Sequence, residues 1–181
     1  STQLTIASLE LGMRNLPVVE AAYRQALRIE PNFVPALLNL ADFYRSVGQE
    51  AQGQPLIQKA LSVAPESGAA NHTYGLYLVR QKDYRAALEY LKAAVEAEDA
   101  EPRYAYVYAI ALENSDQIEQ AIEVLTAAIN RWPTQYDLLL TQVTFMDKSG
   151  DTEMIYQYIS QLTAIAPNSA EVSKFVQKYI N

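Results

Sequence analysis

The chain has 181 residues, and half of them (50%) are hydrophobic, which is enough apolar surface for a continuous core. Its formal net charge of −7, from 21 acidic and 14 basic residues, disfavours nucleic acid and membranes as partners because both present negative charge. Cysteine is absent, which excludes disulfides, zinc–thiolate sites and thiol nucleophiles. No apolar run approaches the roughly 20 residues needed to span a bilayer. Because the chain begins at Ser1 without an initiator methionine, we expect a processed or excised piece of a longer protein.

Prolines recur along the chain at a fixed step of 34 residues. Pro31, Pro65, Pro133 and Pro167 fall on this register, and the missing member falls at Asp99. Two further columns keep the same step without an insertion: Ala26, Ala60, Ala94, Ala128 and Leu162 in one, and Ala7, Ala41, Gly75, Ala109 and Val143 in the other. A period of this length is typical of helical hairpins that stack on one another.

The register predicts pairs of helices followed by a closing helix. In chain order, the predicted ranges are 2–12, 16–30, 34–47, 50–63, 68–81, 84–97, 102–114, 118–131, 136–149, 152–165 and 169–180. Large residues at alternate positions in 104–110 would by themselves suggest a strand, but the register places them in a helix. Gly48 and Gly150 are predicted to lie at helix ends that need a positive φ. The residues predicted to cap the helix that follows them are Asp83, Asp116, Asp151 and Asn168.

Pro55 breaks the pattern, because it falls inside the predicted helix 50–63. Proline lacks the N–H that would bond to Ala51 and clashes with the carbonyl of that residue, at a cost of about 3 kcal/mol in a regular helix. We therefore expect this helix to start late, near Gln54, or to kink between Ala51 and Pro55.

Each column of the repeat has a physical reason, and the columns together resemble one repeat family. Small residues stand where the two helices of a hairpin cross, large residues lie beside them, and a proline ends the second helix. At a 34-residue step this combination resembles the tetratricopeptide repeat (TPR) family over essentially the whole chain. The resemblance implies an all-α TPR helical-hairpin solenoid, a right-handed superhelix. A single array would span 1–181, with five repeats at about 1–33, 34–67, 68–101, 102–135 and 136–169 and a C-terminal capping helix at 170–181.

The chain offers no arrangement of residues for catalysis. His72 is the only histidine, so it has no second histidine or cysteine with which to build a metal site or a dyad. The sequence contains no glycine-rich phosphate loop, no G-x-S-x-G elbow and no H-E-x-x-H motif. We therefore predict that the protein is not an enzyme and has no catalytic residue, no metal site and no cofactor.

The family resemblance implies a partner-binding groove on the first helices of the repeats. Tyr74 and Tyr108 are assigned to the core, whereas Tyr106 is the better binding candidate, since an interfacial tyrosine offers a large contact area at a low entropic cost. The alternative for Tyr106 is a half-buried structural tyrosine. Some TPR proteins grip acidic C-termini with Lys and Asn, but only Asn39 matches that clamp here, so it is not present. The predicted groove consists of Leu38, Asn39, Asp42, Arg45, His72, Thr73, Leu76, Val79, Arg80, Arg103, Tyr106, Val107 and Ile110.

The main functional prediction is a protein–protein interaction scaffold. It would bind a protein or peptide partner through this near-neutral aliphatic and tyrosine surface. The alternative is a structural accessory or self-association segment of a larger, exported bacterial protein, with contacts through an uncapped N-terminal repeat. Residues Tyr74–Arg80 and Arg103–Leu112 are similar to TPR segments appended to bacterial periplasmic multihaem cytochromes, which favours the periplasm over the cytoplasm. The chain has no C-x-x-C-H motif and so binds no haem of that type.

Overall fold

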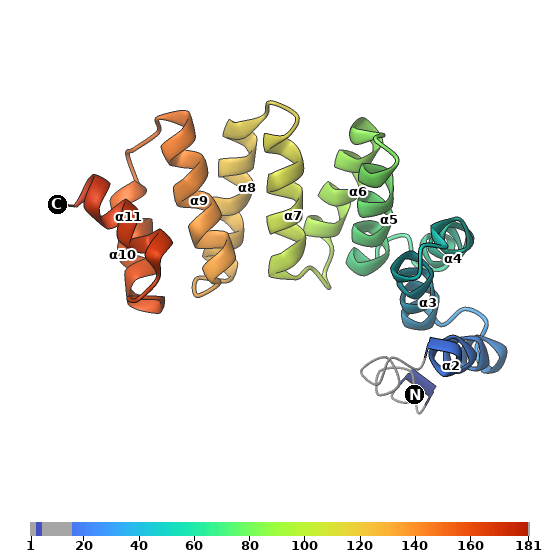
Figure 1. Ribbon diagram of the computed structural model, residues 1–181. Helices are drawn as coiled ribbons and strands as arrows, with labels where there is room; N and C mark the ends of the chain where they lie inside the picture. Colours follow the sequence, from blue (N-terminus) through green and yellow to red (C-terminus); the bar gives the residue numbers. More distant parts are fainter. Residues whose placement is uncertain (1–2, 5–15, 181) are drawn as a thin grey trace. The chain divides into compact units, whose positions relative to one another are not determined.

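The computed structural model describes residues 3–4 and 16–180, and these residues form helices and turns without a strand (Figure 1). The prediction of an all-α fold is confirmed. Three predicted ranges, 50–63, 118–131 and 136–149, coincide with observed helices. The helices are α2 (Leu16–Ile29), α3 (Val34–Ser46), α4 (Glu50–Val63), α5 (Gly68–Arg80), α6 (Tyr84–Glu96), α7 (Pro102–Glu113), α8 (Ile118–Arg131), α9 (Tyr136–Ser149), α10 (Ile155–Ile165) and α11 (Ala170–Tyr179). Most of the predicted helix 2–12 lies outside the described residues.

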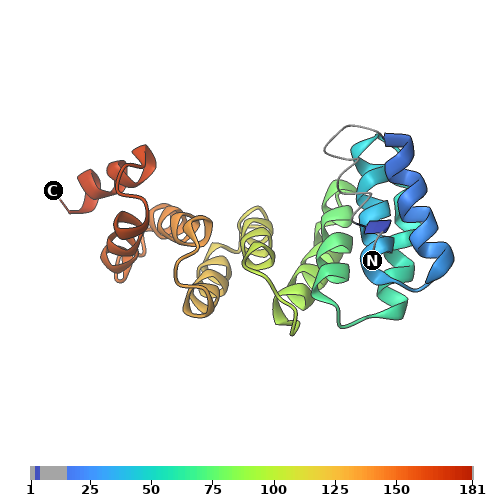
Figure 2. The ribbon, with the colours of Figure 1, turned by 90° about the horizontal axis from the view of Figure 1, so that it is seen from below.

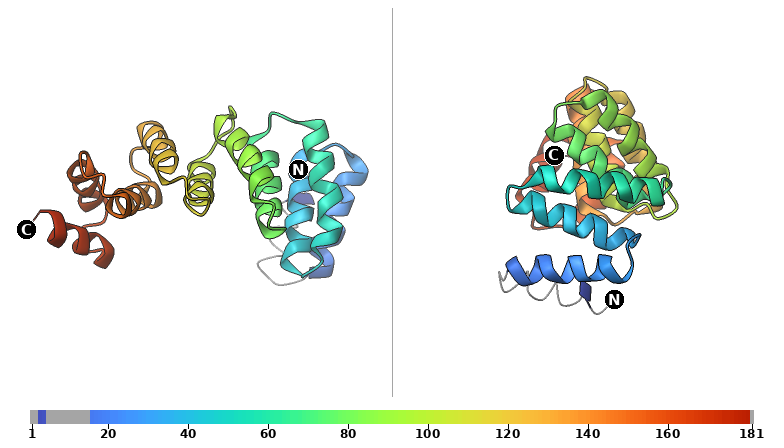
Figure 3. Two further views of the ribbon diagram at one scale, coloured as in Figure 1. Left: turned by 90° about the horizontal axis from the view of Figure 1, so that it is seen from above. Right: turned by 90° about the vertical axis from the view of Figure 1, so that its right-hand side faces the viewer.

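The chain divides into two compact units, Ser1–Asp99 and Ala100–Asn181. In the first unit, α3 packs against α2, α4 and α5, and α5 also packs against α4 and α6. Figure 3 (right) shows α2, α3 and α4 of this unit as successive layers, and Figure 2 shows the helices of the unit from below. Each helix therefore contacts its neighbours in the sequence, as expected for stacked hairpins.

The second unit follows the same plan. Helix α8 packs against α7 and α9, and α10 packs against α9 and α11. The first helices of its two hairpins, α7 and α9, also contact each other directly. Residues 102–113 form a helix, so the register was the correct guide to this segment and the local alternation of large residues was not.

The small-residue columns lie where helices approach closely. A Cβ placed on Gly75 would stand 2.8 Å from Cγ of Leu91, across the α5–α6 hairpin. A Cβ on Gly53 would stand 2.9 Å from the carbonyl oxygen of Ala41, across the α3–α4 hairpin. Ala109 is fully buried at the corresponding position of α7. The absence of a larger side chain at these points allows the paired helices to pack at short range.

Three of the predicted turn and cap residues act as expected. Gly48 and Gly150 have φ values of 75° and 78°, the left-handed geometry that favours glycine after a helix. Asp83 precedes α6, and its Oδ1 accepts a hydrogen bond from the backbone N–H of Ala86 at 3.3 Å. This bond satisfies one of the N–H groups that the first turn of a helix leaves open.

Three other cap predictions were wrong. Asp116 has a φ of 58° and lies in the turn, so Gln117 stands at the N-cap position of α8. Helix α10 begins at Ile155 and not at 152, and Oδ1 of Asp151 accepts from the N–H of Glu153 within the preceding loop. The closing helix is capped by Ser169 and not by Asn168, because Oγ of Ser169 accepts from the N–H of Val172 at 3.4 Å. The backbone path of each loop determines which side chain reaches the N–H groups at the start of the next helix, and the repeat period does not specify that path.

Pro55 lies inside a continuous helix. Because α4 begins at Glu50, the expected late start near Gln54 was wrong. Pro55 itself is exposed, so its ring is not part of the core. The expectation of a kink between Ala51 and Pro55 stays a prediction.

The missing proline of the repeat is replaced by a carboxylate with a role of its own. Oδ1 of Asp99 accepts a hydrogen bond from the backbone N–H of Gly68 at 2.7 Å, at the first residue of α5. A Cβ on Gly68 would stand 2.8 Å from this same oxygen. Asp99 therefore caps α5 from the end of the same α5–α6 hairpin, and a carboxylate is well suited to the positive end of a helix dipole.

Gln142 is a buried polar residue in a column that is otherwise apolar or aromatic. Its side chain is 1% exposed, its Nε2 donates to Oγ1 of Thr126 at 2.8 Å, and its Oε1 has no hydrogen-bond partner within the described part of the chain. A buried polar atom without a partner costs free energy. Thr126 keeps its own bond to the carbonyl oxygen of Ile122 at 2.9 Å, so removing the glutamine leaves no new orphan.

We therefore expect Gln142→Leu to raise the free energy of unfolding by about 1 kcal/mol. Urea unfolding followed by circular dichroism measures this change. The exposed Gln157 on α10 supplies the control, since Gln157→Leu buries no polar atom and should be neutral. A destabilised Gln142→Leu variant would show that the bond to Thr126 outweighs the unpaired carbonyl oxygen.

A candidate interaction surface on the first helices

In the first unit, the predicted groove residues lie along α3 and α5 and differ in exposure. Leu38 and His72 are buried, at 8% and 7% exposed, so they offer little area to a ligand. The remaining residues of this group are at the surface: Asn39, Asp42, Arg45 and Arg80 are exposed, and Thr73, Leu76 and Val79 are half-buried. The exposed part of this face is therefore mostly polar.

In the second unit, four predicted residues form one stripe along α7: Arg103, Tyr106, Val107 and Ile110, here called the α7 stripe. Tyr106 and Val107 stand three or four positions from both Arg103 and Ile110, which places the four residues on the same side of a helix. Arg103 is exposed, Tyr106 is 37% exposed, and Val107 and Ile110 are half-buried. Tyr108, which the sequence assigned to the core, is buried at 8%.

The face of α9 next to this stripe is also largely uncharged in its middle. Leu140 is half-buried and Thr144 is exposed. The Thr144 hydroxyl donates to the carbonyl oxygen of Leu140 at 2.7 Å, and the Thr141 hydroxyl donates to that of Asp137 at 2.7 Å. Because these hydroxyl protons are already used within the helix, this part of the surface offers few hydrogen-bond donors.

Several charges on each face form ion pairs within their own unit. In the first unit, Arg45 bonds Asp42 at 2.7 Å, and Arg80 bonds Glu50 at 2.5 Å. In the second unit, Lys148 of α9 pairs with Glu113 of α7. These ion pairs were not foreseen from the sequence, which indicated only that the charges of the face balance.

Asp147 joins α9 to the closing helix. Its Oδ1 accepts hydrogen bonds from Nζ of Lys178 and from the hydroxyl of Tyr179. The bond from Lys178 is the main reason why the pKa of Asp147 lies below its usual range, and the bond from Tyr179 adds to it. The closing helix is thus held by an ion pair in addition to its buried Val172.

The lowered pKa of Asp147 predicts a pH dependence of stability. The carboxylate is favoured in the folded state, so its contribution is fully present above its unfolded pKa of about 3.9 and is lost as the pH falls through the lower folded pKa. We expect Asp147→Asn to lower the Tm by about 2–4 °C at neutral pH. This difference from the wild type should shrink below about pH 4. Thermal melts across the acid range measure it, and a constant difference would contradict the assignment.

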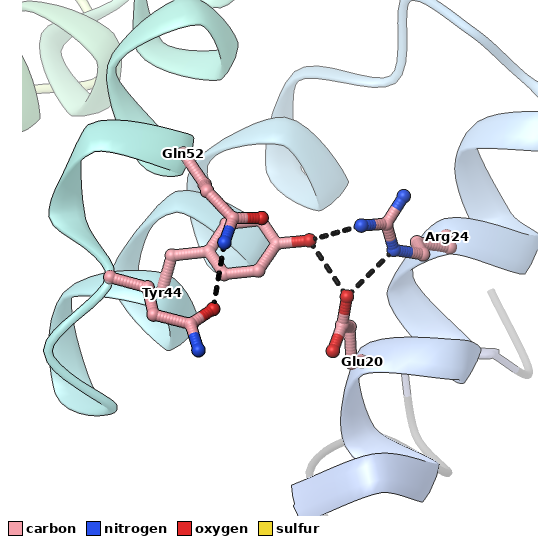
Figure 4. A network of polar contacts seen from close by, with 5 residues as sticks. Glu20, Arg24, Tyr44 and Gln52 are labelled. Carbon is pink, nitrogen blue, oxygen red and sulfur yellow. Dashed lines mark hydrogen bonds and ion pairs between the residues drawn. The ribbon is translucent and has the colours of Figure 1, made fainter.

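A second polar network ties α2 to α3 in the first unit (Figure 4). The Tyr44 hydroxyl donates to Oε1 of Glu20 at 2.8 Å and accepts from Nη2 of Arg24 at 2.7 Å. Arg24 also bonds Glu20 directly at 2.8 Å, and this bond is the main cause of the lowered pKa of Glu20. The one signal for this network in the sequence is the four-residue spacing of Glu20 and Arg24 on a helix.

The described residues contain neither a metal-ligand group of three or more His, Cys, Asp or Glu side chains nor a helix long and apolar enough to cross a membrane. In the part of the chain that the structure describes, the first helices of each unit present partly exposed faces that carry ion pairs, and α7 adds the exposed Tyr106. Such a surface is suited to contact with another polypeptide.

Comparisons with known proteins agree on the family. The family model for anaphase-promoting complex, cyclosome, subunit 3 matches residues 47–128, and a tetratricopeptide repeat model matches residues 22–54. The chain is 22% identical over 127 residues to the TPR repeat-containing protein YpiA of Bacillus subtilis (strain 168). That match spans 70% of this chain and only 30% of YpiA.

Solved structures share the fold. PilF of Pseudomonas aeruginosa matches with a TM-score of 0.80 at 18% identity, over 99% of this chain and 83% of PilF. YrrB, described as a TPR protein with an unusual peptide-binding site, matches with a TM-score of 0.68 at 19% identity, over 97% of this chain and 90% of YrrB. MamA of Desulfovibrio magneticus RS-1 matches with a TM-score of 0.70 at 19% identity, over 93% of this chain and 96% of MamA.

The stacked helical hairpins and the family matches are those of an α-helical repeat scaffold for protein interactions. Within that class, the two family matches and the TPR repeat-containing relative support a tetratricopeptide repeat protein.

Proposed function

We propose that this chain binds a peptide or a partner surface along the first helices of its repeats, with the α7 stripe as the main contact. The observation that carries the proposal is Tyr106, a 37% exposed aromatic residue beside the half-buried aliphatic residues Val107 and Ile110. Tyrosines at the centre of protein interfaces contribute large contact area and a hydroxyl that can bond to the partner. The α7 stripe combines these properties on a rigid helix.

Support for a contact of this kind comes from the physical chemistry of the surface and from one structural neighbour. An interface needs an apolar centre with a polar rim, and the α7 stripe has aliphatic residues in its middle and Arg103 at one end. YrrB, which shares the fold, is described as having a peptide-binding site.

The test is an affinity capture with the 181-residue chain as bait, analysed by mass spectrometry. We expect specific partners to be retained by the wild type and lost with Tyr106→Ala. The matched control is Tyr84→Ala, since Tyr84 is an exposed tyrosine (53%) on the second helix α6 and not on a first helix. If both variants retain the same partners, the α7 stripe is not the contact.

A second candidate function, self-association, is favoured by the surface of α10. Between Glu153 and Glu171 the chain carries no charged residue, although part of this segment, including Tyr156 (54% exposed), faces solvent. Like charges would otherwise oppose the pairing of two copies of a chain of charge −7. Sedimentation equilibrium decides this alternative. A dimer that Tyr156→Glu converts to a monomer supports it, and a wild-type monomer at high concentration contradicts it.

The compartment is also a proposal. We place the parent protein in the bacterial periplasm, on the resemblance of Tyr74–Arg80 and Arg103–Leu112 to TPR segments of exported cytochromes. Fractionation of cells that express the tagged parent protein tests this. Recovery in the cytoplasmic fraction alone would reject it.

A further inference from the structure

We infer that the segment bound on α7 and α9 is uncharged and presents aliphatic or aromatic side chains. The inference rests on the proposed function and specifies the chemistry of the partner. The surface concerned, here called the α7/α9 face, consists of the α7 stripe together with Leu140 and Thr144 of α9. Helices α7 and α9 contact each other directly, so these residues belong to one surface of the second unit.

The charges at one end of this face are already compensated. Glu113, near the end of α7, pairs with Lys148 of α9, and Asp147 of α9 bonds Lys178 and Tyr179 of the closing helix. A charged ligand side chain would have to compete with an existing partner of the same sign. Surface ion pairs of this type give little net attraction to a third charge, because the two members cancel at the distance of a ligand.

The opposite end of the face is also close to neutral. Arg103 and Asp137 stand at equivalent positions near the starts of α7 and α9, and both are exposed. Their charges have opposite signs. The face as a whole therefore has no excess of either sign with which to select an acidic or a basic segment.

The middle of the face gives a ligand apolar area and few donors. Tyr106, Val107, Ile110 and Leu140 provide aromatic and aliphatic surface. The hydroxyl proton of Thr144 is held by the carbonyl oxygen of Leu140 within its own helix. A charged side chain placed here would lose hydration with no opposite charge to compensate it, whereas an apolar side chain would gain by burial.

The experiment is a selection of random peptides displayed on phage against the 181-residue chain, at about 0.15 M and again at about 1 M salt. We expect the enriched peptides to lack Asp, Glu, Lys and Arg in their shared motif. Their affinity should change less than about twofold between the two salt concentrations, because screening does not act on apolar contacts. Ile110→Glu should weaken these peptides by about tenfold or more, whereas Tyr84→Ala should leave them unchanged.

A second variant tests the role of the ion pair. Lys148→Met leaves Glu113 without its partner, so the face then carries one more negative than positive charge. Selection against this variant should enrich peptides that contain Lys or Arg, with affinity that falls at high salt. Glu113→Gln combined with Lys148→Met removes both charges and should restore the preference for uncharged peptides.

The outcomes separate this inference from the function on which it rests. Enrichment of charged, salt-sensitive peptides that still require Ile110 would overturn the inference and keep the α7 stripe as the binding surface. Absence of any enriched peptide that responds to Ile110→Glu would reject the proposed function and the inference together. If the Lys148→Met variant selects the same uncharged peptides as the wild type, the Glu113–Lys148 ion pair is not what keeps the face neutral, and this part of the inference is overturned.

Discussion

Replacing Leu91 with alanine is expected to lower the free energy of unfolding by about 2–5 kcal/mol. Leu91 lies on α6 and is fully buried, with its side chain filling the space that Gly75 leaves open on α5. The truncation removes apolar atoms from the core and leaves a cavity that the two helices of the hairpin can close only in part. Chemical denaturation of the wild type and the variant measures the loss.

The same contact can be tested from the side of Gly75. Gly75→Ala would place a Cβ 2.8 Å from Cγ of Leu91, so overpacking should cost about 1–3 kcal/mol although alanine favours helix formation more than glycine does. In the Leu91→Ala background this clash is absent, and Gly75→Ala should be neutral or stabilising. The double variant should therefore be more stable than the sum of the two single changes predicts. Additive effects would show that the helices separate without strain and that the small-residue column is not a packing requirement.

Replacing Pro55 with alanine is expected to raise the free energy of unfolding by about 1–3 kcal/mol. Helix α4 runs continuously from Glu50 to Val63, so Pro55 occupies an interior position where it cannot donate the helical hydrogen bond to the carbonyl of Ala51. Pro55 is exposed, and alanine would restore this bond without removing a core contact. Thermal and urea unfolding measure the gain.

A proline at the start of a helix provides the control for this change. Pro35 stands in the first turn of α3, where a missing N–H is harmless, so Pro35→Ala should change stability little. Equal and small effects of the two substitutions would show that α4 accommodates Pro55 without cost. The kink expected between Ala51 and Pro55 would then not exist.

Much of the fold could be predicted from the sequence because the repeat imposes the same packing problem several times. Ala41, Gly75 and Ala109 meet a partner helix at equivalent points, so their common spacing predicts helices that begin and end at the same places in each repeat. This regularity also predicted the helix at 102–113 against its local pattern. The α7 stripe could be proposed in the same way, because equivalent positions of first helices lie on one side.

Loop details were less predictable. Asp116 has the sequence signature of a cap and lies one residue too early, because its φ of 58° belongs to the turn. Ser169 caps the closing helix in place of Asn168, one position away. Asp99, in the column of prolines, looked like a gap in the pattern and caps α5 from the far end of the α5–α6 hairpin. These bonds depend on where a loop places its backbone, and a shift of one residue changes which side chain reaches the open N–H groups.

The sequence by itself determined the repeat and the all-α fold, because these follow from the periodicity of small and large residues. Only the tertiary structure decided which surface residues are available to a partner. His72 and Tyr106 were both candidates on first helices, yet His72 is 7% exposed and Tyr106 is 37% exposed. It also decided that Glu113 neutralises Lys148, two residues of different repeats. Exposure and charge pairing depend on which side chains of neighbouring helices meet, and that requires the packed structure.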